Sequence, residues 1–312
     1  MNSRRIIAVV GADGFVGGRL AEALQARRVV YGPCRNGEVH ISQAEGVLRN
    51  ADVIINAGGF RVRPGLAYAD YQRSHQRATS VFVPWIQSGA LLLHISSASV
   101  LGKSKDQKLG NQTPPTPRTF PCPAYALAKL EADQYLQRAA TERGFRLILL
   151  RPSVLYAPHG DSMIDSLLRM AKRGVILRLY PRGVRHHLCD TRLLVDVVRH
   201  VIQEDLPQPT SLVVADPYTV TNRELETMIR RHAPKKSVTL PLPVALVSML
   251  LRMSLRSRNP KLDLRTWSEI LGVLNLDTVY DPFETFGLLG IEPSKYSLDR
   301  TLQPLIEEAL HG

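Results

Sequence analysis

The chain has 312 residues, of which 44% are hydrophobic, 22% are charged and 6% are aromatic, and its formal net charge is +12. This composition is typical of a globular protein, and the length allows one large domain with a smaller second lobe. Few aromatic residues and no zinc-finger, homeodomain or RNP pattern exclude the common nucleic-acid-binding modules, so the charge indicates either an anionic substrate or a basic solvated surface.

Short apolar runs alternate with helical patterns in the first half, which predicts an α/β fold, a Rossmann-type doubly wound parallel sheet with crossover helices. Strands are expected at residues 5–10, 29–31, 39–41, 53–57, 91–96 and 146–150. Helices are expected at residues 15–27, 70–87 and 124–143. Because only a short piece separates the second and third strands, we expect the crossover helix there to be lost or reduced.

The second half is less regular. We expect a helix at 191–203, a strand at 211–214, and a further helix that opens with the capping-box spacing of Thr221 and Glu224. Residues after 235 look mainly helical. The longest apolar stretch, residues 240–251, is too short to span a membrane and predicts a buried or interfacial helix.

The cysteines, Cys34, Cys122 and Cys189, are far apart and form no C-x-x-C pair. Neither a disulfide framework nor a zinc site is therefore expected, and a reducing compartment fits. The first residues run into an apolar strand without the pattern of a secretory signal. We expect a cytoplasmic protein without stable membrane insertion.

A glycine-rich loop follows the first strand, where residues 11–17 read Gly-Ala-Asp-Gly-Phe-Val-Gly. Glycine lets the backbone turn tightly and approach a pyrophosphate without a Cβ clash. The following helix presents free N–H groups and the positive end of its dipole. The loop is therefore predicted to bind a dinucleotide, the alternative being a purely structural turn.

The pair Tyr125 and Lys129 lies on the long helix at a spacing that puts both side chains on one face. A nearby ammonium should lower the pKa of the tyrosine, which could then exchange a proton with a substrate oxygen while a hydride moves to or from nicotinamide. A packed aromatic with a solvated lysine is the alternative. Some thirty residues earlier, a strand ends at Ser96, Ser97 and Ser99, where a hydroxyl can hydrogen-bond the reacting oxygen.

These motifs resemble the extended short-chain dehydrogenases/reductases, in the branch of the NAD-dependent epimerases and dehydratases. The opening GADGFVGGRL carries the resemblance, with matches at 56–58, 150–158, 280–281 and 289–293. It covers nearly the whole chain, more loosely in the second half. It implies an NAD(P)-binding Rossmann domain over 1–155, to which about 188–216 returns, and a smaller, mainly helical substrate-binding lobe over 156–312. Homodimers are common in the family.

The resemblance also implies the site residues. The catalytic residues would be Ser97, Tyr125 and Lys129. Cofactor contacts are implied at Gly11, Gly14, Phe15, Val16, Gly17, Asn56, Ala57, Gly58, Tyr125, Lys129 and Pro152. Substrate contacts are implied at Ser99 and Arg185, and a surface charge is the alternative for Arg185.

Several positions depart from the family pattern. Leu101 replaces the tyrosine of the family's V-Y-G, which should alter the substrate pocket. Ala98 and Ser99 stand where sugar 4,6-dehydratases carry an acid and a base, which argues against a dehydratase. The family's V-x-V-D-D segment is degraded at 188–192. No fourth ligand accompanies His186, His187 and Cys189, so no metal is predicted there.

The end of the second strand bears on the choice of cofactor. An acid there binds the ribose hydroxyls of NAD, whereas an arginine suits the 2′-phosphate of NADP. Residues 31–36 contain no acid but include Arg35. NADP is therefore predicted, with NAD as the alternative.

The leading hypothesis is an NAD(P)-dependent oxidoreductase or epimerase that acts on a nucleotide-activated sugar by hydride transfer with a Ser-Tyr-Lys triad. One alternative is an NADPH-dependent carbonyl reductase of an apolar ketone or aldehyde, which the apolar run at 244–255 favours. Another is a non-catalytic cofactor-sensing protein, against which the intact triad argues. No nucleic-acid partner is expected.

Overall fold

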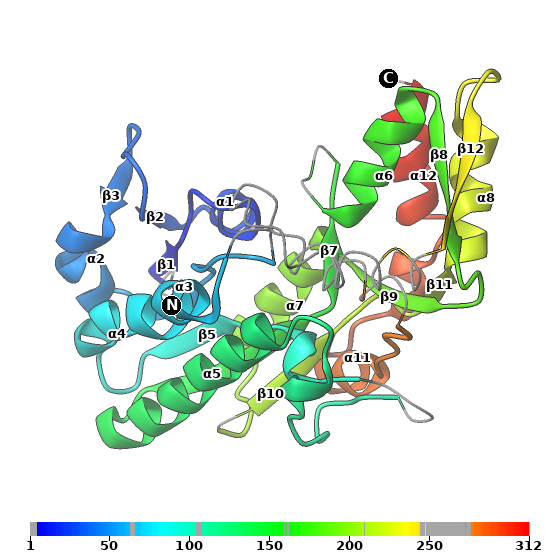
Figure 1. The fold of residues 1–312 in the computed structure, drawn as a ribbon. Helices are drawn as coiled ribbons and strands as arrows, with labels where there is room; N and C mark the ends of the chain where they lie inside the picture. The colour runs from blue at the N-terminus through cyan, green and yellow to red at the C-terminus, as the bar shows by residue number, and fades with distance from the viewer. Residues whose placement is uncertain are drawn as a thin grey trace.

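The computed structural model describes residues 5–62, 66–103, 108–158, 160, 162–208, 210–243, 247, 272 and 276–311. Figure 1 shows a large sheet with helices on both faces, and a smaller lobe that projects from it at the upper right of the view. None of the described helices is both long and apolar enough to cross a membrane.

The large sheet has seven parallel strands in the order β10-β6-β5-β4-β1-β2-β3. Its strands are β1 (Ile7–Val10), β2 (Arg27–Val30), β3 (Glu38–His40), β4 (Val53–Asn56), β5 (Leu91–Ile95), β6 (Arg146–Pro152) and β10 (Thr210–Val214). The strand order reverses on either side of β1, and ligands of such sheets bind beyond the carboxyl ends of the strands at this switch point. The predicted Rossmann-type fold is confirmed.

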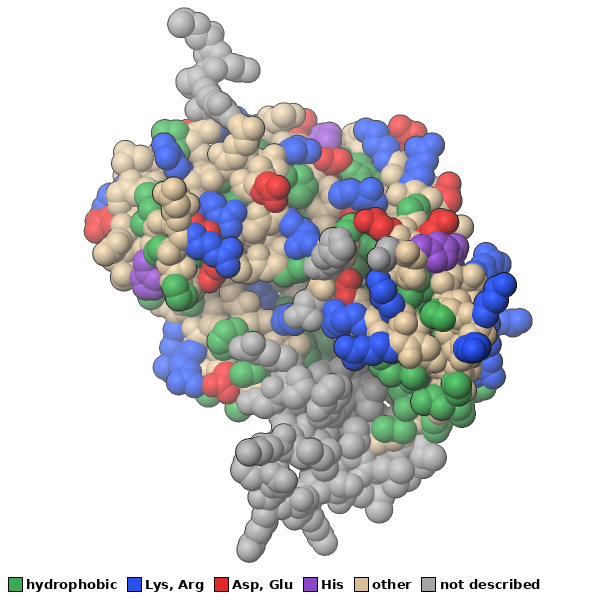
Figure 2. All heavy atoms as spheres, turned by 90° about the horizontal axis from the view of Figure 1, so that it is seen from above, with side chains coloured by type: hydrophobic (Ala, Val, Ile, Leu, Met, Phe, Trp, Pro, Cys, Tyr) green, Lys and Arg blue, Asp and Glu red, His purple; other side chains and the backbone are tan. Residues whose placement is uncertain are grey.

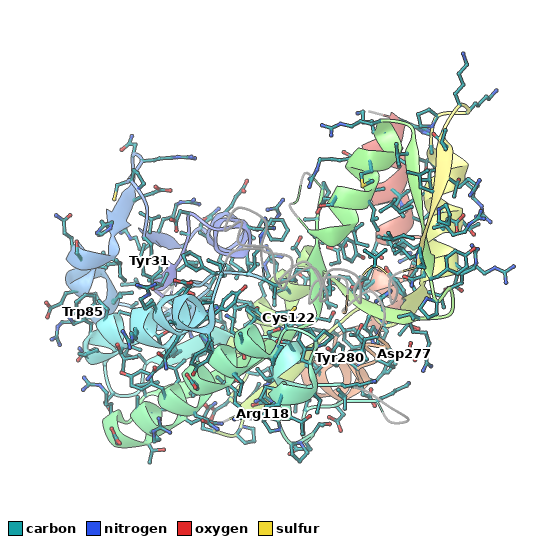
Figure 3. The ribbon with its side chains drawn as sticks, viewed as in Figure 1. Tyr31, Trp85, Arg118, Cys122, Asp277 and Tyr280 are labelled. Carbon is teal, nitrogen blue, oxygen red and sulfur yellow. The ribbon has the colours of Figure 1, made fainter. Side chains whose placement is uncertain are left out.

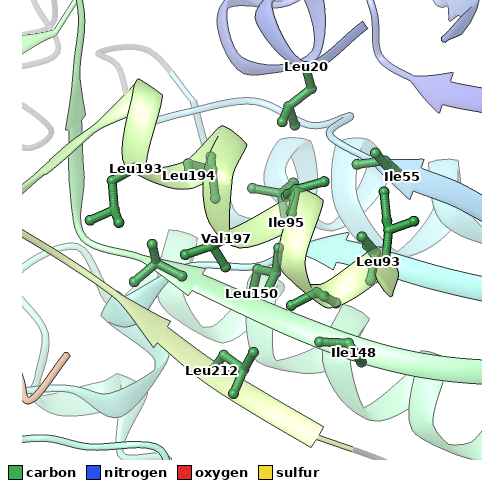
Figure 4. Packing of buried hydrophobic residues seen from close by; sticks show 14 of the residues in the cluster. Leu20, Ile55, Leu93, Ile95, Ile148, Leu150, Leu193, Leu194, Val197 and Leu212 are labelled. Atoms are coloured by element: carbon green, nitrogen blue, oxygen red, sulfur yellow. The ribbon is translucent and has the colours of Figure 1, made fainter. Parts of the chain in front are cut away.

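Helices cover both faces because the strands are apolar on both sides. On one face, α1 (Phe15–Ala23) and α7 (Thr191–Gln203) pack through residues such as Leu20, Leu193 and Val197, as Figure 4 shows. On the other face lie α2 (Glu45–Arg49), α4 (Ala78–Phe82) and α5 (Pro123–Arg143). Helix α5 ends as expected at Gly144, whose φ of 73° suits a residue without a Cβ.

Two features of the first half can be compared with the sequence-based expectations: the connection between β2 and β3, and the helix expected at 70–87. Strands β2 and β3 are parallel neighbours joined only by residues 31–37, which contain no helix, so the predicted loss of the crossover helix is confirmed. The helix expected at 70–87 is a composite of α3 (Tyr68–Gln72), a π-helical turn η2 (Arg73–Arg77), α4 and the 3₁₀ turn η3 (Val83–Trp85).

The second half contains two small sheets. One has the order β11-β9-β7, from β7 (Val154–Tyr156), β9 (Arg185–Asp190) and β11 (Thr219–Thr221). The other pairs β8 (Val175–Tyr180) with β12 (Val238–Pro243). The helices are α6 (Met163–Lys172), α8 (Asn222–His232), α11 (Phe283–Leu289) and α12 (Leu302–His311). Thr221 and Glu224 form the predicted capping box of α8.

The expectation of a helix beginning at residue 240 is wrong, because residues 238–243 form strand β12 in register with β8. Long-range pairing overrides the local apolar pattern there. The rest of the apolar run, residues 244–255, lies outside the described residues except for Val247.

Candidate active site

The glycine-rich loop joins β1 to α1 and packs on the turn that follows β4. Gly11 has a φ of +81°, and a Cβ there would lie 2.7 Å from the Cα and N of Gly58. A Cβ on Gly17 would lie 2.0 Å from the carbonyl oxygen of Gly11. The packing of the chain itself therefore requires glycine at 11 and 17, and this contact brings the first and fourth strand ends together.

Gly14 differs from these two glycines. Its backbone is extended, with φ −86° and ψ 168°, and a Cβ there would meet only the carbonyl oxygen of Gly11, at 3.3 Å. The chain alone does not require glycine at this position, so the open space is suited to a ligand that approaches the backbone closely. Helix α1 begins at Phe15 and Val16 without a side-chain cap, as a pyrophosphate-binding helix end would. The loop fits the group that the sequence predicted.

Asn56, Ala57 and Gly58 form the turn after β4. The Asn56 Oδ1 accepts a hydrogen bond from the Gly58 N–H at 3.1 Å, and its Nδ2 donates to Thr79 Oγ1 at 3.1 Å. Its side chain is buried, so Asn56 holds the turn in place from below. Pro152, the last residue of β6, is also buried.

An acid lies at the end of β2, although it comes from another part of the sequence. The Asp13 Oδ2 accepts a hydrogen bond from the Gly32 N–H at 3.0 Å. The ring of Tyr31 lies against Gly58, and burial, followed by the charge of Asp13, raises the pKa of Tyr31. Figure 3 shows Tyr31 beside the first strands. Sequence reasoning missed Asp13 because it searched only the residues that follow β2.

Arg35 is exposed, on the segment between β2 and β3. Its backbone N–H donates to Glu38 Oε2 at 2.9 Å, and the same carboxylate pairs with Arg28 at 3.0 Å. Arg28 in turn donates to the carbonyl oxygen of Ala12, at 2.8 Å. These contacts tie the β2–β3 connection to the glycine-rich loop.

Ser97, Ser99 and Tyr125 lie together at the carboxyl end of β5. Ser97 caps the 3₁₀ turn η4 (Ala98–Leu101), and its Oγ accepts hydrogen bonds from the Ser99 N–H at 3.2 Å and the Ser99 Oγ at 2.9 Å. Tyr125, near the amino end of α5, lies close enough to Ser97 for the serine side chain to lower the pKa of its phenol. Three hydroxyl groups from two elements thus share one site.

The expected lowering of the tyrosine pKa is not found. Burial raises the pKa of Tyr125 to about 12, and the hydrogen bond with Ser97 only partly opposes this effect. Lys129, one turn further along α5, is 6% exposed and donates from Nζ to the carbonyl oxygen of Ile95 at 2.9 Å. Burial lowers the pKa of Lys129 to about 8, against the opposing charge of Asp133. The phenol is therefore protonated at neutral pH in the free protein.

A buried polar network lies next to Lys129. The Asp133 Oδ2 accepts from Ser96 Oγ at 2.9 Å and lies 3.5 Å from the Arg151 guanidinium. His94 Nε2 lies 3.7 Å from Asp133 Oδ1, but burial, followed by the charge of Lys129, lowers the pKa of His94 well below its usual value. His94 is therefore neutral, and Lys129 and Arg151 supply the positive charges that compensate Asp133.

His75 is a site residue that sequence reasoning missed. It lies in the π-helical turn η2, is 1% exposed, and its ring meets that of Tyr125 edge-on at 5.6 Å. It fills the space beside Gly59, where a Cβ would lie 2.1 Å from His75 Nδ1. Burial and the charge of Lys129 lower the pKa of His75 well below its usual value. The sequence signal that could have indicated His75 was its position four residues after Tyr71, on the core side of a helical pattern. In addition, π-helical turns are frequent at functional sites.

Arg185 is not brought into contact with these hydroxyls in the described structure. It begins β9, and its guanidinium pairs with Asp277 at 2.9 Å, half-exposed. Figure 3 shows Asp277 well to the right of Cys122, the residue that precedes α5. The guanidinium is thus engaged by an ion pair with Asp277.

Leu101 and the two histidines of β9 are buried. Leu101 is fully buried in a small apolar cluster with Leu109 and Tyr280. His186 Nε2 is hydrogen-bonded to Asn222 at 2.9 Å, and His187 Nε2 to the carbonyl oxygen of Asp216 at 2.8 Å. These histidines serve packing and hydrogen bonding between β9 and its neighbours.

Comparison with known proteins agrees with this geometry. The model of the NAD dependent epimerase/dehydratase family matches residues 7–215. A UDP-glucose 4-epimerase of Vibrio cholerae is 25% identical over 124 residues, and this alignment spans 38% of the chain and only 37% of that relative.

Among the solved structures that resemble nearly the whole chain are two with different bound dinucleotides. UDP-glucuronic acid 4-epimerase from Bacillus cereus, in complex with UDP-glucuronic acid and NAD, has a TM-score of 0.74 at 15% identity, covering 97% of this chain and 98% of that one. RMD from Pseudomonas aeruginosa, complexed with NADPH, has a TM-score of 0.70 at 14% identity, covering 98% and 99%. At these identities the likeness concerns the fold.

Proposed function

Because the chain belongs to the NAD-dependent epimerase/dehydratase family, we propose that it is an epimerase or reductase that acts on a nucleotide-activated sugar by hydride transfer. The observation that carries the proposal is the proximity of the Ser97 and Tyr125 side chains at the end of β5, on the same sheet edge as the glycine cradle. Reactive hydroxyls and a dinucleotide loop at one edge are what hydride transfer needs.

The protein residues have distinct roles in this scheme. Bound nicotinamide would supply the hydride acceptor or donor. The Tyr125 phenol, protonated in the free protein, donates its proton to a substrate oxygen during reduction and takes one back during oxidation. Ser97 holds the same oxygen by a hydrogen bond. Lys129, fixed on the Ile95 carbonyl, supplies a buried positive charge near the proton-transfer site.

A nucleotide sugar is favoured over an apolar ketone by the family and by the net charge of +12, since a nucleoside diphosphate is an anion. Figure 2 shows the basic side chains scattered over the face in view, not merged into one patch, so long-range attraction is spread over the surface. We propose Ser99 as a substrate contact because its hydroxyl touches that of Ser97. To bind the diphosphate of a substrate, Arg185 would have to break its ion pair with Asp277.

A screen of ligands tests the substrate class. UDP-, GDP- and dTDP-sugars that bind the folded state should raise the unfolding temperature, and more so in the presence of dinucleotide. A panel of apolar ketones provides the comparison. A clear shift with the ketones and none with any nucleotide sugar would favour the carbonyl-reductase alternative.

For the cofactor, we propose NAD on the basis of Asp13, which supplies the acid that β2 itself lacks. An acid at this strand end binds ribose hydroxyls and repels a 2′-phosphate. The earlier expectation of NADP rests on Arg35, which is exposed and carries its own positive charge. The two residues therefore predict opposite preferences.

Calorimetric titration of NAD and NADP separates them. With Asp13 dominant, the wild type binds NAD better, and Asp13→Asn gains affinity for NADP relative to NAD. With Arg35 dominant, the wild type prefers NADP, and Arg35→Ala loses that preference.

Two further expectations remain predictions. One is the division into a Rossmann domain over 1–155 and a substrate lobe over 156–312. The other is a homodimeric state.

A further inference from the structure

Three side chains with metal-binding atoms gather at one end of the smaller lobe. His232 is the last residue of α8, His311 is the last residue of α12, and Glu307 lies one turn before His311. Their ligand atoms all lie within 4.8 Å of one another, and the two imidazole rings are 5.2 Å apart. Residues four apart share a helix face, so Glu307 and His311 both lie toward His232.

These donors form a chemically matched set. Two imidazoles and one carboxylate, with water in the fourth position, are a common ligand set for zinc. Zinc bonds of about 2.0–2.1 Å place tetrahedral ligand atoms about 3.3–3.4 Å apart, so the three side chains need to close only slightly. Glu307 and His311 are exposed and His232 is half-buried, so an ion can enter from solvent.

The helix ends add a second, independent attraction. Both α8 and α12 end at this cluster, and Figure 1 shows them running toward the same end of the lobe. Each helix carboxyl end carries roughly half a negative charge, which favours a cation. Basic residues nearby oppose it, namely Arg231, Lys235 and Lys236, while Arg230 is paired with Glu226 at 2.6 Å. We therefore expect micromolar affinity, weaker than that of a closed structural zinc site.

We propose that His232, Glu307 and His311 bind a divalent transition-metal ion, with zinc the best match, and that this ion links α8 to α12. The two helices already share the core of the lobe, where Leu225 and Ile229 of α8 pack in one cluster with Leu302 and Ile306 of α12. An ion held by both helices binds the folded state only, so it raises the stability of the lobe.

The test is calorimetric titration of zinc chloride into full-length protein freed of metal by a chelator. We expect one micromolar site at neutral pH that weakens at acid pH, because protonated imidazole does not bind metal. Glu307→Gln and His311→Ala should each weaken binding by at least about tenfold. Glu308→Gln removes the same charge from the next residue of α12 and should leave the affinity unchanged. Equal affinity in Glu307→Gln, His311→Ala and wild type overturns the proposal.

The exposed thiol of Cys34 is the competing zinc ligand. Cys34→Ser should therefore keep the site, and cobalt bound in place of zinc should lack the absorption of a thiolate complex. Loss of zinc binding in Cys34→Ser, with retention in Glu307→Gln, would assign the ion to Cys34. Unfolding temperatures of all variants without metal show whether each is folded, and only wild type, Glu308→Gln and Cys34→Ser should gain stability from zinc.

Discussion

The hydroxyl of Tyr125 is a single group that should affect turnover without affecting cofactor binding. We expect Tyr125→Phe to lower kcat by about 10²–10⁴, because it removes a positioned proton donor. Dinucleotide affinity should stay near that of the wild type, since the hydroxyl contacts Ser97. Tyr135→Phe, on the same helix but packed against the sheet, is the matched control. Near-normal turnover of Tyr125→Phe would remove this residue from the mechanism.

Two glycines of the loop should respond differently to an added side chain. Gly14→Val should abolish dinucleotide binding in a folded protein, because the backbone there is extended and the added atoms enter open space. Gly17→Ala should also lower the stability, since its Cβ would lie 2.0 Å from the Gly11 carbonyl oxygen. Calorimetric titration and urea unfolding measure the two effects. Unchanged affinity in Gly14→Val would mean that the loop is only a structural turn.

Between elements, Asp216 joins the large sheet to the small one. It follows β10, and it accepts hydrogen bonds from the N–H of Asp190, the last residue of β9, at 2.9 Å and from the Tyr156 hydroxyl of β7 at 2.8 Å. Burial raises its pKa to about 7. Between about pH 4 and pH 7 the folded state therefore holds a proton that the unfolded state has lost, so this group makes stability fall as pH rises.

Asp216→Asn should remove that pH dependence. At about 1.4 kcal/mol per pKa unit, the ionised carboxylate costs up to about 4 kcal/mol above pH 7. The free energy of unfolding in urea, measured at about pH 5 and pH 8, should fall less in the variant than in the wild type. Asp205→Asn, whose side chain is 95% exposed, is the control. An equal fall in wild type and Asp216→Asn would show that Asp216 does not titrate in this range.

Elements with local signals could be predicted from the sequence, whereas contacts between distant segments could not. Helix α8 has a capping box at Thr221 and Glu224, which predicts where the helix begins. Helix α7 has an apolar periodicity, which predicts both of its bounds. Strand β12 was missed because its partner β8 lies some sixty residues earlier, and pairing across that distance leaves no local signal.

The same reasoning applies to the site. The glycine loop and the pair Ser97 and Tyr125 follow from motifs at fixed spacing. The position of Asp13 at the end of β2 and the orientation of Lys129 toward Ile95 depend on how separate segments pack. Burial likewise reverses the expected pKa shift of Tyr125, because spacing along a helix says nothing about desolvation.

For the whole molecule, the net charge of +12 should make the KM for an anionic substrate depend on salt. Raising ionic strength shortens the Debye length from about 10 Å at 0.1 M to about 3 Å at 1 M. We expect KM for a nucleotide sugar to rise with salt while kcat changes little, because the chemistry occurs among buried groups. A KM that is independent of salt would mean that attraction by the basic surface plays no part.

The most direct test of the central claim is to incubate the protein with dinucleotide and a nucleotide sugar and to follow the sugar by NMR. UDP-glucose and UDP-glucuronic acid are suitable first substrates, because the relative and the solved structure described above carry these names or ligands. The account predicts conversion of at least one nucleotide sugar by the wild type, either to an epimer without net use of cofactor or to a reduced product with stoichiometric oxidation of NAD(P)H, and none by Tyr125→Phe. Conversion that survives in Tyr125→Phe, or failure with every UDP-, GDP- and dTDP-sugar while an apolar ketone is reduced, would contradict it.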